Sequence, residues 1–319
     1  MSSADVVPET WELSGDDAWE TLASTGRRRL ARDAFRRFRS ADGTSHARSM
    51  AFLSELIVIQ GIVIALGLAS ALSDGNLSRL IVDTLRGVAP GPAGKVLTQA
   101  VTQAHQAGSS HRYAALIIGL AAVVISGAML MGQLERGLNR IYGIERDRPT
   151  VSKYARAFVL AVSAGLLSAA AFVALAIGHS IAGSLGSRTS VRIWDVVRWP
   201  VGIALAMAMI ALLYRWSPRR RQPAWSWLAF GAVVAVILWT LCTIALSLFF
   251  AFSSSFGQTY GPLAGIIALA LWSFATSVAI LYGAAVAAQL ESVRAGTPTV
   301  SEDATADRRR DQVSAPASV

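Results

Sequence analysis

The feature that most constrains this chain is a series of long apolar runs that carry almost no charge. They cover residues 49–72, 113–133, 157–182, 199–214, 227–252 and 263–290. A helix of about 20 apolar residues crosses a bilayer, where every backbone hydrogen bond has to be satisfied within the protein. The runs therefore predict an all-α, polytopic membrane protein with six transmembrane helices. In the fourth run Pro200 follows Trp199, so we expect the helix to begin there, with the proline in its first turn.

The composition agrees with this interpretation. Charged residues make up 15% of the chain and hydrophobic residues 53%, whereas a soluble domain has about 25% charged residues. A soluble globular enzyme is thereby close to excluded.

The basic residues indicate the orientation of the helices. Of the 29 lysines and arginines, 22 fall in alternate segments: the N-terminal segment, the second and fourth connections and the C-terminal segment. Cytoplasmic loops are enriched in these residues, so we expect both termini in the cytoplasm. Because topology accounts for the positive charge, we expect no nucleic acid as a partner.

Three segments outside the helices complete the predicted organisation. Residues 1–48 form a cytoplasmic segment, residues 73–112 a small helical outer cap within the 49–290 membrane domain, and residues 291–319 a disordered cytoplasmic tail. The tail is rich in Ser, Thr, Ala, Pro, Asp and Arg and has no apolar periodicity.

A basic amphipathic helix is predicted at residues 27–40. Leu30, Ala31, Ala34, Phe35 and Phe38 share one face, and six arginines, Arg37 among them, cover most of the remainder. We expect it to lie on the anionic inner leaflet, with membrane lipids, including anionic phospholipids, as partners. In the alternative, it packs against the cytoplasmic loops of the protein itself.

No pattern in the sequence predicts catalysis. The four histidines are far apart, Cys242 is the single cysteine, and neither a Walker A motif nor a nucleophile elbow occurs. We expect no enzymatic activity, no metal and no cofactor.

Two polar residues in the first span are candidates for a substrate path. Glu55 is ionisable and Gln60 follows on the same helix. An ionisable group in a span usually faces protein or water and often marks a path. The alternative for Glu55 is a structural pair near the interface, with Arg48 two helical turns earlier or with a loop arginine.

Three stretches carry a family resemblance. They read LNRIYGIERDRP at residues 138–149, YRWSPR at 214–219, and YGPLAG at 260–265 with Trp272 and Gly283 further along the same span. The chain resembles the YihY/BrkB family of bacterial inner-membrane proteins, which includes YhjD-type proteins and was formerly catalogued as ribonuclease BN. The resemblance implies six spans, cytoplasmic termini and a role in envelope integrity, with lipid or lipopolysaccharide export as the usual proposal. Its motif residues here are Asn139, Tyr142, Gly261, Gly265, Trp272 and Gly283.

The motif at the end of the second span suggests two roles. Asn139 could bond a loop carbonyl while Tyr142 anchors at the level of the headgroups. Arg140, Arg146 and Arg148 could clamp phosphate-bearing headgroups, because guanidinium forks match phosphate oxygens. In the alternative, the three arginines are ordinary positive-inside charges.

Two functions remain open at this point. One is a lipid or lipid-linked cargo transporter that works without nucleotide hydrolysis and uses Glu55 and Gln60. The other is a scaffold of an envelope assembly, in which small residues such as Gly261 and Gly265 contact a partner protein or a second copy. Ribonuclease activity is not expected, because nothing here resembles a metal-dependent nuclease cluster.

Overall fold

The computed structural model describes residues 4–71, 112–184, 188–253, 260 and 263–297. Within these ranges all regular structure is helical, which confirms the all-α prediction for this part of the chain. The helices are α1 (Gly15–Thr25), α2 (Arg27–Ser40), α3 (Gly43–Ala71), α6 (Arg112–Ile141), α7 (Thr150–Ser184), α8 (Arg188–Trp216), α9 (Trp225–Phe252) and α11 (Leu263–Arg294). Residues 73–111 of the outer cap, residues 298–319 of the tail and Gly261 lie outside the described residues. Residues 291–294, predicted to belong to the disordered tail, form the last turn of α11.

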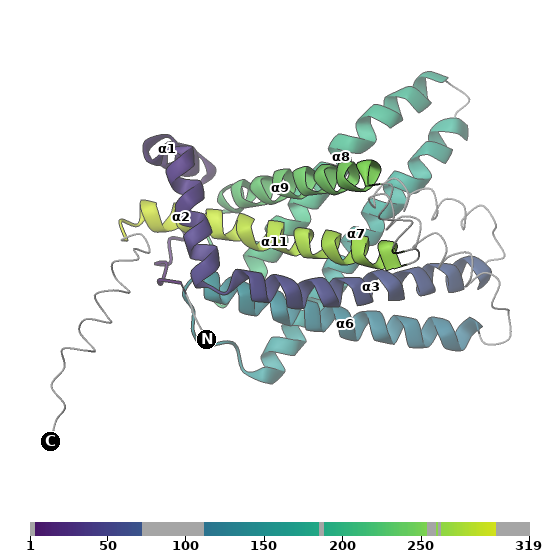
Figure 1. Ribbon diagram of the computed structural model, residues 1–319, viewed down its shortest axis with the longest axis horizontal. Coiled ribbons are helices and arrows are strands. Elements are labelled where there is room, and N and C mark those ends of the chain that lie inside the picture. Colours follow the sequence, from purple (N-terminus) through teal and green to yellow (C-terminus); the bar gives the residue numbers. More distant parts are fainter. Residues whose placement is uncertain (1–3, 72–111, 185–187, 254–259, 261–262, 298–319) are drawn as a thin grey trace.

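The six long helices lie in one bundle and alternate in direction. α11 packs against α3 and α9, α6 pairs with α3, and α7 and α8 complete the bundle next to α6 and α9 (Figure 1). The α6–α7 and α8–α9 connections therefore lie at one end, together with α1, α2 and the C-terminal end of α11. We call this end the strap end, after a segment described below.

Four of the long helices contain stretches long and apolar enough to cross a membrane. These stretches are Ile117–Ile141, Thr150–Ser168, Trp225–Phe252 and Leu263–Arg294, and Pro200–Trp216 is a shorter apolar helix. The expected first span lies in α3, where nearly all side chains after Gly61 are outside the described set. The number six therefore remains a prediction, and the structure supports several membrane-crossing helices.

The expected start of the fourth span is wrong. α8 already begins at Arg188, so Pro200 lies inside the helix and not in its first turn. Ile193, Val196 and Val197 continue an apolar pattern upstream of the proline. The missing N–H of Pro200 leaves one carbonyl without its helical partner, a defect that membrane helices tolerate when other groups satisfy it.

A close helix contact joins α9 and α11. A Cβ added at Gly283 would lie 2.5 Å from the carbonyl oxygen of Gly231, and one added at Gly231 would lie 2.8 Å from that of Gly283. Tyr214 on α8 donates a hydrogen bond to the carbonyl of Ile280 at the same level. Small residues thus allow backbone contact between helices within the chain itself.

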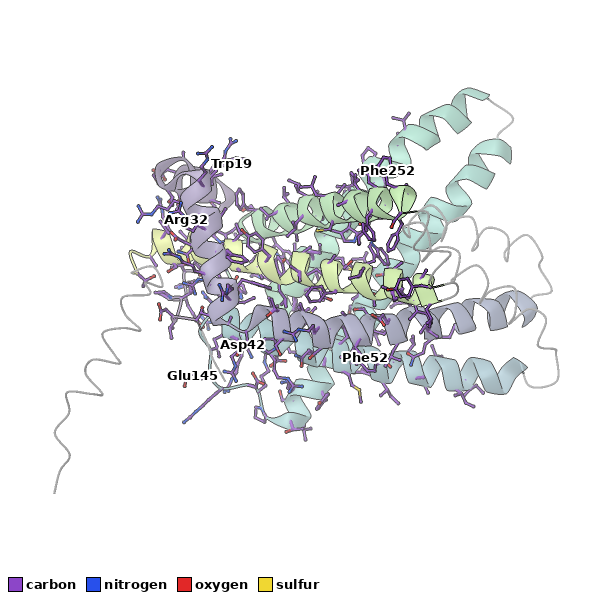
Figure 2. All side chains as sticks on the ribbon, viewed as in Figure 1. Trp19, Arg32, Asp42, Phe52, Glu145 and Phe252 are labelled. Atoms are coloured by element: carbon purple, nitrogen blue, oxygen red, sulfur yellow. The ribbon has the colours of Figure 1, made fainter. Side chains whose placement is uncertain are left out.

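Helix α2 occupies the segment predicted to be amphipathic and lies across the strap end (Figure 1). Its apolar face is buried against α11: the Phe38 ring packs edge-on to Tyr282, whose hydroxyl donates to the carbonyl of Ala31 at 3.0 Å. The opposite face is exposed, and Arg32 points away from the bundle (Figure 2). Ala31 and Phe35, expected on the apolar face, are exposed as well, because each follows a buried residue by one position, about 100° around the helix. The protein itself therefore buries Leu30, Ala34 and Phe38, and the arginines other than Arg37 face outward.

Candidate functional site

An irregular segment at residues 4–13 crosses the end of the bundle, and we call it the strap. The backbone N–H of Ala4 donates to the carbonyl of Arg140, and that of Val7 to the carbonyl of Tyr142. At its other end, the carbonyl of Leu13 accepts a hydrogen bond from the N–H of Ala224. The strap therefore connects the end of α6 to the start of α9.

A buried ion pair lies under the strap. Glu291 near the end of α11 and Arg220 from the α8–α9 connection are 2.5 Å apart, and their side chains are 0% and 3% exposed. The hydroxyl of Thr10 on the strap donates to the same carboxylate oxygen at 2.6 Å. The guanidinium of Arg220 lies over the ring of Tyr142, 4.6 Å from its centroid. One carboxylate thus joins the strap, α11 and the α8–α9 connection.

Arg37 is a second buried cation at this end. Its Nε donates to Oε1 of Gln289 at 2.8 Å, and its Nη1 donates to the carbonyls of Asp5 and Ile141. None of these hydrogen bonds reaches a carboxylate. Burial lowers the pKa of Arg37 to about 10, against the opposing influence of the Asp5 charge, so the group stays protonated at neutral pH.

Arg37 corrects a feature of the predicted helix. The expectation placed it on the polar face, yet it is fully buried with Leu30, Ala34 and Phe38. The spacing contained the signal, because Arg37 follows Leu30 by two helical turns and so shares its face. Sequence reasoning also missed Thr10 and Glu291 as partners, since they lie 281 residues apart.

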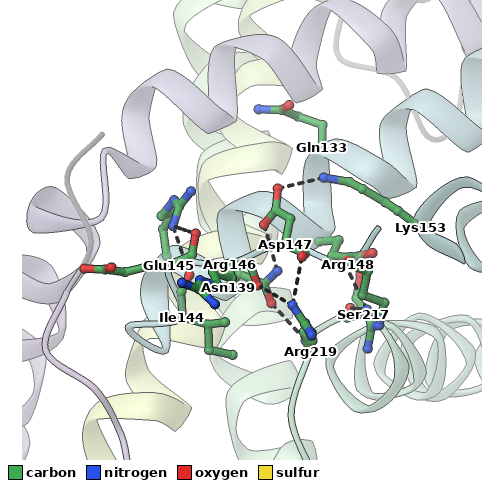
Figure 3. Close-up of polar contacts among 12 residues, drawn as sticks. Gln133, Asn139, Ile144, Glu145, Arg146, Asp147, Arg148, Lys153, Ser217 and Arg219 are labelled. Carbon is green, nitrogen blue, oxygen red and sulfur yellow. Dashed lines mark hydrogen bonds and ion pairs between the residues drawn. The ribbon is translucent and has the colours of Figure 1, made fainter. Parts of the chain in front are cut away.

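The family motif after α6 forms a compact polar network (Figure 3). The side-chain amide of Asn139 donates to Asp147 at 3.0 Å, and its oxygen accepts the backbone N–H of Arg219 at 2.9 Å. Lys153 pairs with Asp147 at 2.8 Å. Although burial raises the pKa of Asp147, the hydrogen bonds from Lys153 and Asn139 outweigh it and lower the pKa overall. Asn139 therefore connects two loops through a carboxylate and an N–H, where a loop carbonyl was expected.

Tyr142 differs from its expected place at the headgroup level. Its side chain is fully buried beneath Arg220. Burial raises the pKa of its hydroxyl well above the ordinary value. The guanidinium of Arg220 lies over the face of this ring, a cation–π arrangement that helps to stabilise a buried charge.

Arg148 is bound within the protein. It donates to the carbonyls of Ser217 at 2.8 Å and Pro218 at 2.7 Å, and it lies 3.0 Å from the carboxylate of Glu135. These carbonyls follow the end of α8, where backbone acceptors lack helical partners. The side chain thus stabilises a helix end in this conformation.

The other two arginines of the predicted clamp differ from each other. Arg140 donates to the carbonyls of Ile144 and Glu145 at 3.0 and 2.7 Å. Arg146 is exposed. The structure therefore brings the three arginines into one loop region but does not direct their guanidiniums at one point, and the headgroup clamp stays a prediction.

Gln60 and Glu55 lie on different sides of α3. Gln60 donates to the hydroxyl of Ser126 on α6 at 3.2 Å, so it faces the bundle. Glu55 precedes it by five residues, which is about 140° around a helix, and is partly exposed. Arg48 donates to the carbonyl of Thr44, and no ion pair joins it to Glu55 in the described part of the chain. The pair with Arg48 is not formed, and both the pair with a loop arginine and the substrate path stay predictions.

The remaining motif residues lie on α11. Gly265 is buried, Trp272 donates its ring N–H to the hydroxyl of Thr243 on α9 at 3.2 Å, and Gly283 forms the crossing with α9. Their contacts join α11 to α9. Among the residues that the structure describes, no group of three or more His, Cys, Asp or Glu side chains could hold a metal ion.

Comparison with known proteins identifies the family of this chain. A model of the family described as Virulence factor BrkB matches residues 34–308. The chain is 24% identical to the ribonuclease-like protein YfkH of Bacillus subtilis over 269 residues, 81% of this chain and 94% of that protein. It is 27% identical to a UPF0761 membrane protein of Idiomarina loihiensis, over 58% of this chain and 65% of that protein. It is 29% identical to a UPF0761 membrane protein of Cronobacter sakazakii, over 59% of this chain and 63% of that protein. No solved structure matches.

Proposed function

The chain belongs to the BrkB family of membrane proteins, and from that premise we propose that it moves lipid or lipid-linked cargo across the bacterial inner membrane. In this proposal it has six spans and cytoplasmic termini, and it contributes to envelope integrity without hydrolysing a nucleotide. The alternating helix directions support the orientation, because they gather the arginine-rich connections at the strap end (Figure 1).

The observation that carries the proposal is the position of α1 and α2. Trp19 of α1 packs edge-on against Phe230, 5.8 Å between ring centroids, within the first turns of the apolar helix α9. Tyr282 holds α2 at a similar depth along α11. Trp216 and Trp225, at adjoining helix ends, are about half exposed, as in an interfacial belt. The two short helices are thus held at the level where headgroups would lie.

The exposed face of α2 supplies positive charge at this level. Its exposed arginines are Arg27, Arg28, Arg29, Arg32, Arg36 and Arg39. Only Arg29 has an acidic partner on the same helix, Asp33 at 3.8 Å. A basic residue at the membrane surface gains about 1 kcal/mol from anionic lipid. We propose that this face collects anionic phospholipids next to the bundle.

The scaffold remains the alternative function. Gly283 already contacts α9 of the same chain, so it is less able to contact a helix of a partner protein. Gly165 on α7 has no atom within 4 Å of an added Cβ and could admit a partner helix or a second copy. We propose no nuclease activity: the name of YfkH refers to one, but no catalytic motif of this sequence supports it.

Lipid scrambling in proteoliposomes tests the proposal. The purified protein should equalise fluorescent phosphatidylglycerol between leaflets, and Glu55→Gln should abolish this if Glu55 lies on the path. Ser54→Ala, next to it on α3, is the matched control and should flip lipid normally. A folded, inserted protein that flips neither anionic nor zwitterionic lipid would contradict transport and favour the scaffold.

A further inference from the structure

The strap covers a buried charged group that the proposed function does not use. We call it the strap site: Arg37, Tyr142, Arg220, Gln289 and Glu291. It contains two buried guanidiniums and one buried carboxylate. The strap adds the nearby charge of Asp5, which acts on Arg37, so the site is net positive once the strap is removed. An unbalanced buried charge is costly unless an oppositely charged partner approaches it.

The strap supplies the oxygen atoms that both arginines bind. Arg37 donates to the carbonyl of Asp5 at 2.9 Å, and Arg220 donates to those of Val7 and Pro8 at 3.3 and 3.0 Å. Three oxygens from one short segment thus face two guanidinium groups. A phosphate group presents several oxygens in a similar space and adds the negative charge that carbonyls lack.

Several polar atoms in the strap site have no partner among the described residues. They are Nη2 of Arg37, Nε2 of Gln289 and Oε2 of Glu291. Buried groups of this kind are rare and require an explanation such as a water or an ion. The two donors suit a further phosphate oxygen. The free carboxylate oxygen suits a hydroxyl or amine next to the phosphate, as many lipid headgroups carry.

The strap is held by hydrogen bonds and buries little apolar surface. Only Ala4 and Val7 of its residues are buried, and Trp11 is 60% exposed. A segment with few apolar contacts is more easily opened than a packed helix. Opening of the strap therefore requires that its hydrogen bonds to Arg37, Arg220 and Glu291 be replaced by those of another ligand.

We propose that the strap site binds a phosphate group and that the strap and the phosphate compete for it. The docked strap is then the closed state, in which carbonyls occupy the position of the ligand. This inference rests on the proposed function only in placing the strap end against the cytoplasmic leaflet. Because the two occupants exclude each other, phosphate must increase the fraction of protein with an open strap.

Maleimide labelling of the strap tests the competition. Val7 is 3% exposed and its neighbour Val6 is 68% exposed, so Val7→Cys and Val6→Cys, both with Cys242→Ala, form a matched pair in the full chain. In dodecyl maltoside, a detergent without phosphate, we expect the Val7→Cys thiol to react roughly tenfold more slowly. Phosphate binding should then accelerate it severalfold while leaving Val6→Cys unchanged.

Two arms separate the sources of phosphate. Both arms use the same phosphate-free detergent. Acceleration by added phosphatidylglycerol, but not by inorganic phosphate, identifies a lipid headgroup; acceleration by inorganic phosphate identifies the free ion. Arg37→Lys keeps the charge but lacks the fork, and should weaken either response.

Three results would overturn the inference. They are equal acceleration by potassium chloride at the same ionic strength, no acceleration in either arm, and a Val7→Cys thiol that reacts as fast as Val6→Cys without any anion. The assay measures no transport, so a protein that fails to flip lipids can still show the competition.

Discussion

At the scale of single residues, the ionisable groups of the strap end depend on each other for burial. Glu291 on α11 accepts hydrogen bonds from Thr10 on the strap and from Arg220 in the α8–α9 connection. Three different parts of the chain therefore meet at this carboxylate. Removing one member of a buried pair leaves the other charge without compensation, which costs more than the pair itself contributes. The loss of stability is therefore largest where both members of the pair are buried.

Glu291→Gln should destabilise the protein strongly. The change is nearly isosteric but leaves the guanidinium of Arg220 buried without a carboxylate, at a cost of about 3–5 kcal/mol. Thermal unfolding in detergent measures it as a lower Tm. Glu20→Gln is the control, because Glu20 pairs with Arg294 at the surface and its side chain is 69% exposed; it should change the Tm little. An equal shift in the two variants would contradict the importance of burial.

The Asp147 network should depend on pH. Hydrogen bonds hold the pKa of Asp147 below the 3.8 of an unperturbed group. Its contribution to stability is therefore complete above that value and is lost as the pH falls through the lower, folded-state pKa. We expect Asp147→Asn to be less stable than the unmodified protein at pH 7, and the difference to narrow near pH 3. A difference that stays constant over this range would contradict the role of the carboxylate.

At the scale of helices, close packing depends on whether a small residue faces the backbone of a neighbouring helix. The α9–α11 crossing admits no side chain at Gly231 or Gly283, while Gly165 on α7 faces open space. Interhelical contact in a membrane relies on such close approach, because lipid tails are as apolar as the side chains. The same residue type therefore has opposite consequences at different helix positions.

Gly283→Ala and Gly165→Ala should change stability in opposite directions. The added Cβ at Gly283 would lie 2.5 Å from a backbone oxygen and 2.7 Å from Ala235 Cβ, and overpacking of this kind costs about 1–3 kcal/mol. At Gly165 the same change meets no atom and gains helix propensity, up to about 1 kcal/mol. Denaturation in mixed micelles compares the two variants. A Gly283→Ala protein as stable as Gly165→Ala would show that the crossing is looser than described.

At the scale of the whole molecule, the bundle has two unlike ends. The strap end contains the strap, α1, α2 and the arginine-rich connections, whereas α9 ends at the other side of the bundle (Figure 1). If the strap end is cytoplasmic, all of these elements face one compartment. This arrangement supports the orientation inferred from the basic residues.

Cysteine accessibility in intact cells should establish this orientation. Glu145 is exposed at the strap end (Figure 2) and Ser253 follows α9 at the opposite end. With Cys242→Ala, a membrane-impermeant maleimide should label Glu145→Cys only after the inner membrane is permeabilised. Ser253→Cys should label without this treatment once the reagent reaches the periplasm. The reverse pattern would place the termini outside.

Some properties followed from the sequence alone. The apolar runs predicted an all-helical membrane protein, and the motif at residues 138–149 indicated the family that the comparison confirms. Both signals are local: hydrocarbon demands a long apolar helix wherever the chain enters it, whatever the rest of the chain does.

Only the tertiary structure decided which polar groups meet. The spacing of the sequence already contained signals for the early start of α8 and for the burial of Arg37, whereas the contacts of Arg37 with Gln289 and of Thr10 with Glu291 join residues distant in sequence. The strap has no periodic pattern that would reveal its path, since its hydrogen bonds go to loops and helix ends elsewhere in the chain. Hydropathy determines that a segment enters a membrane, whereas the pairing of buried charges depends on packing among helices that the linear pattern does not encode.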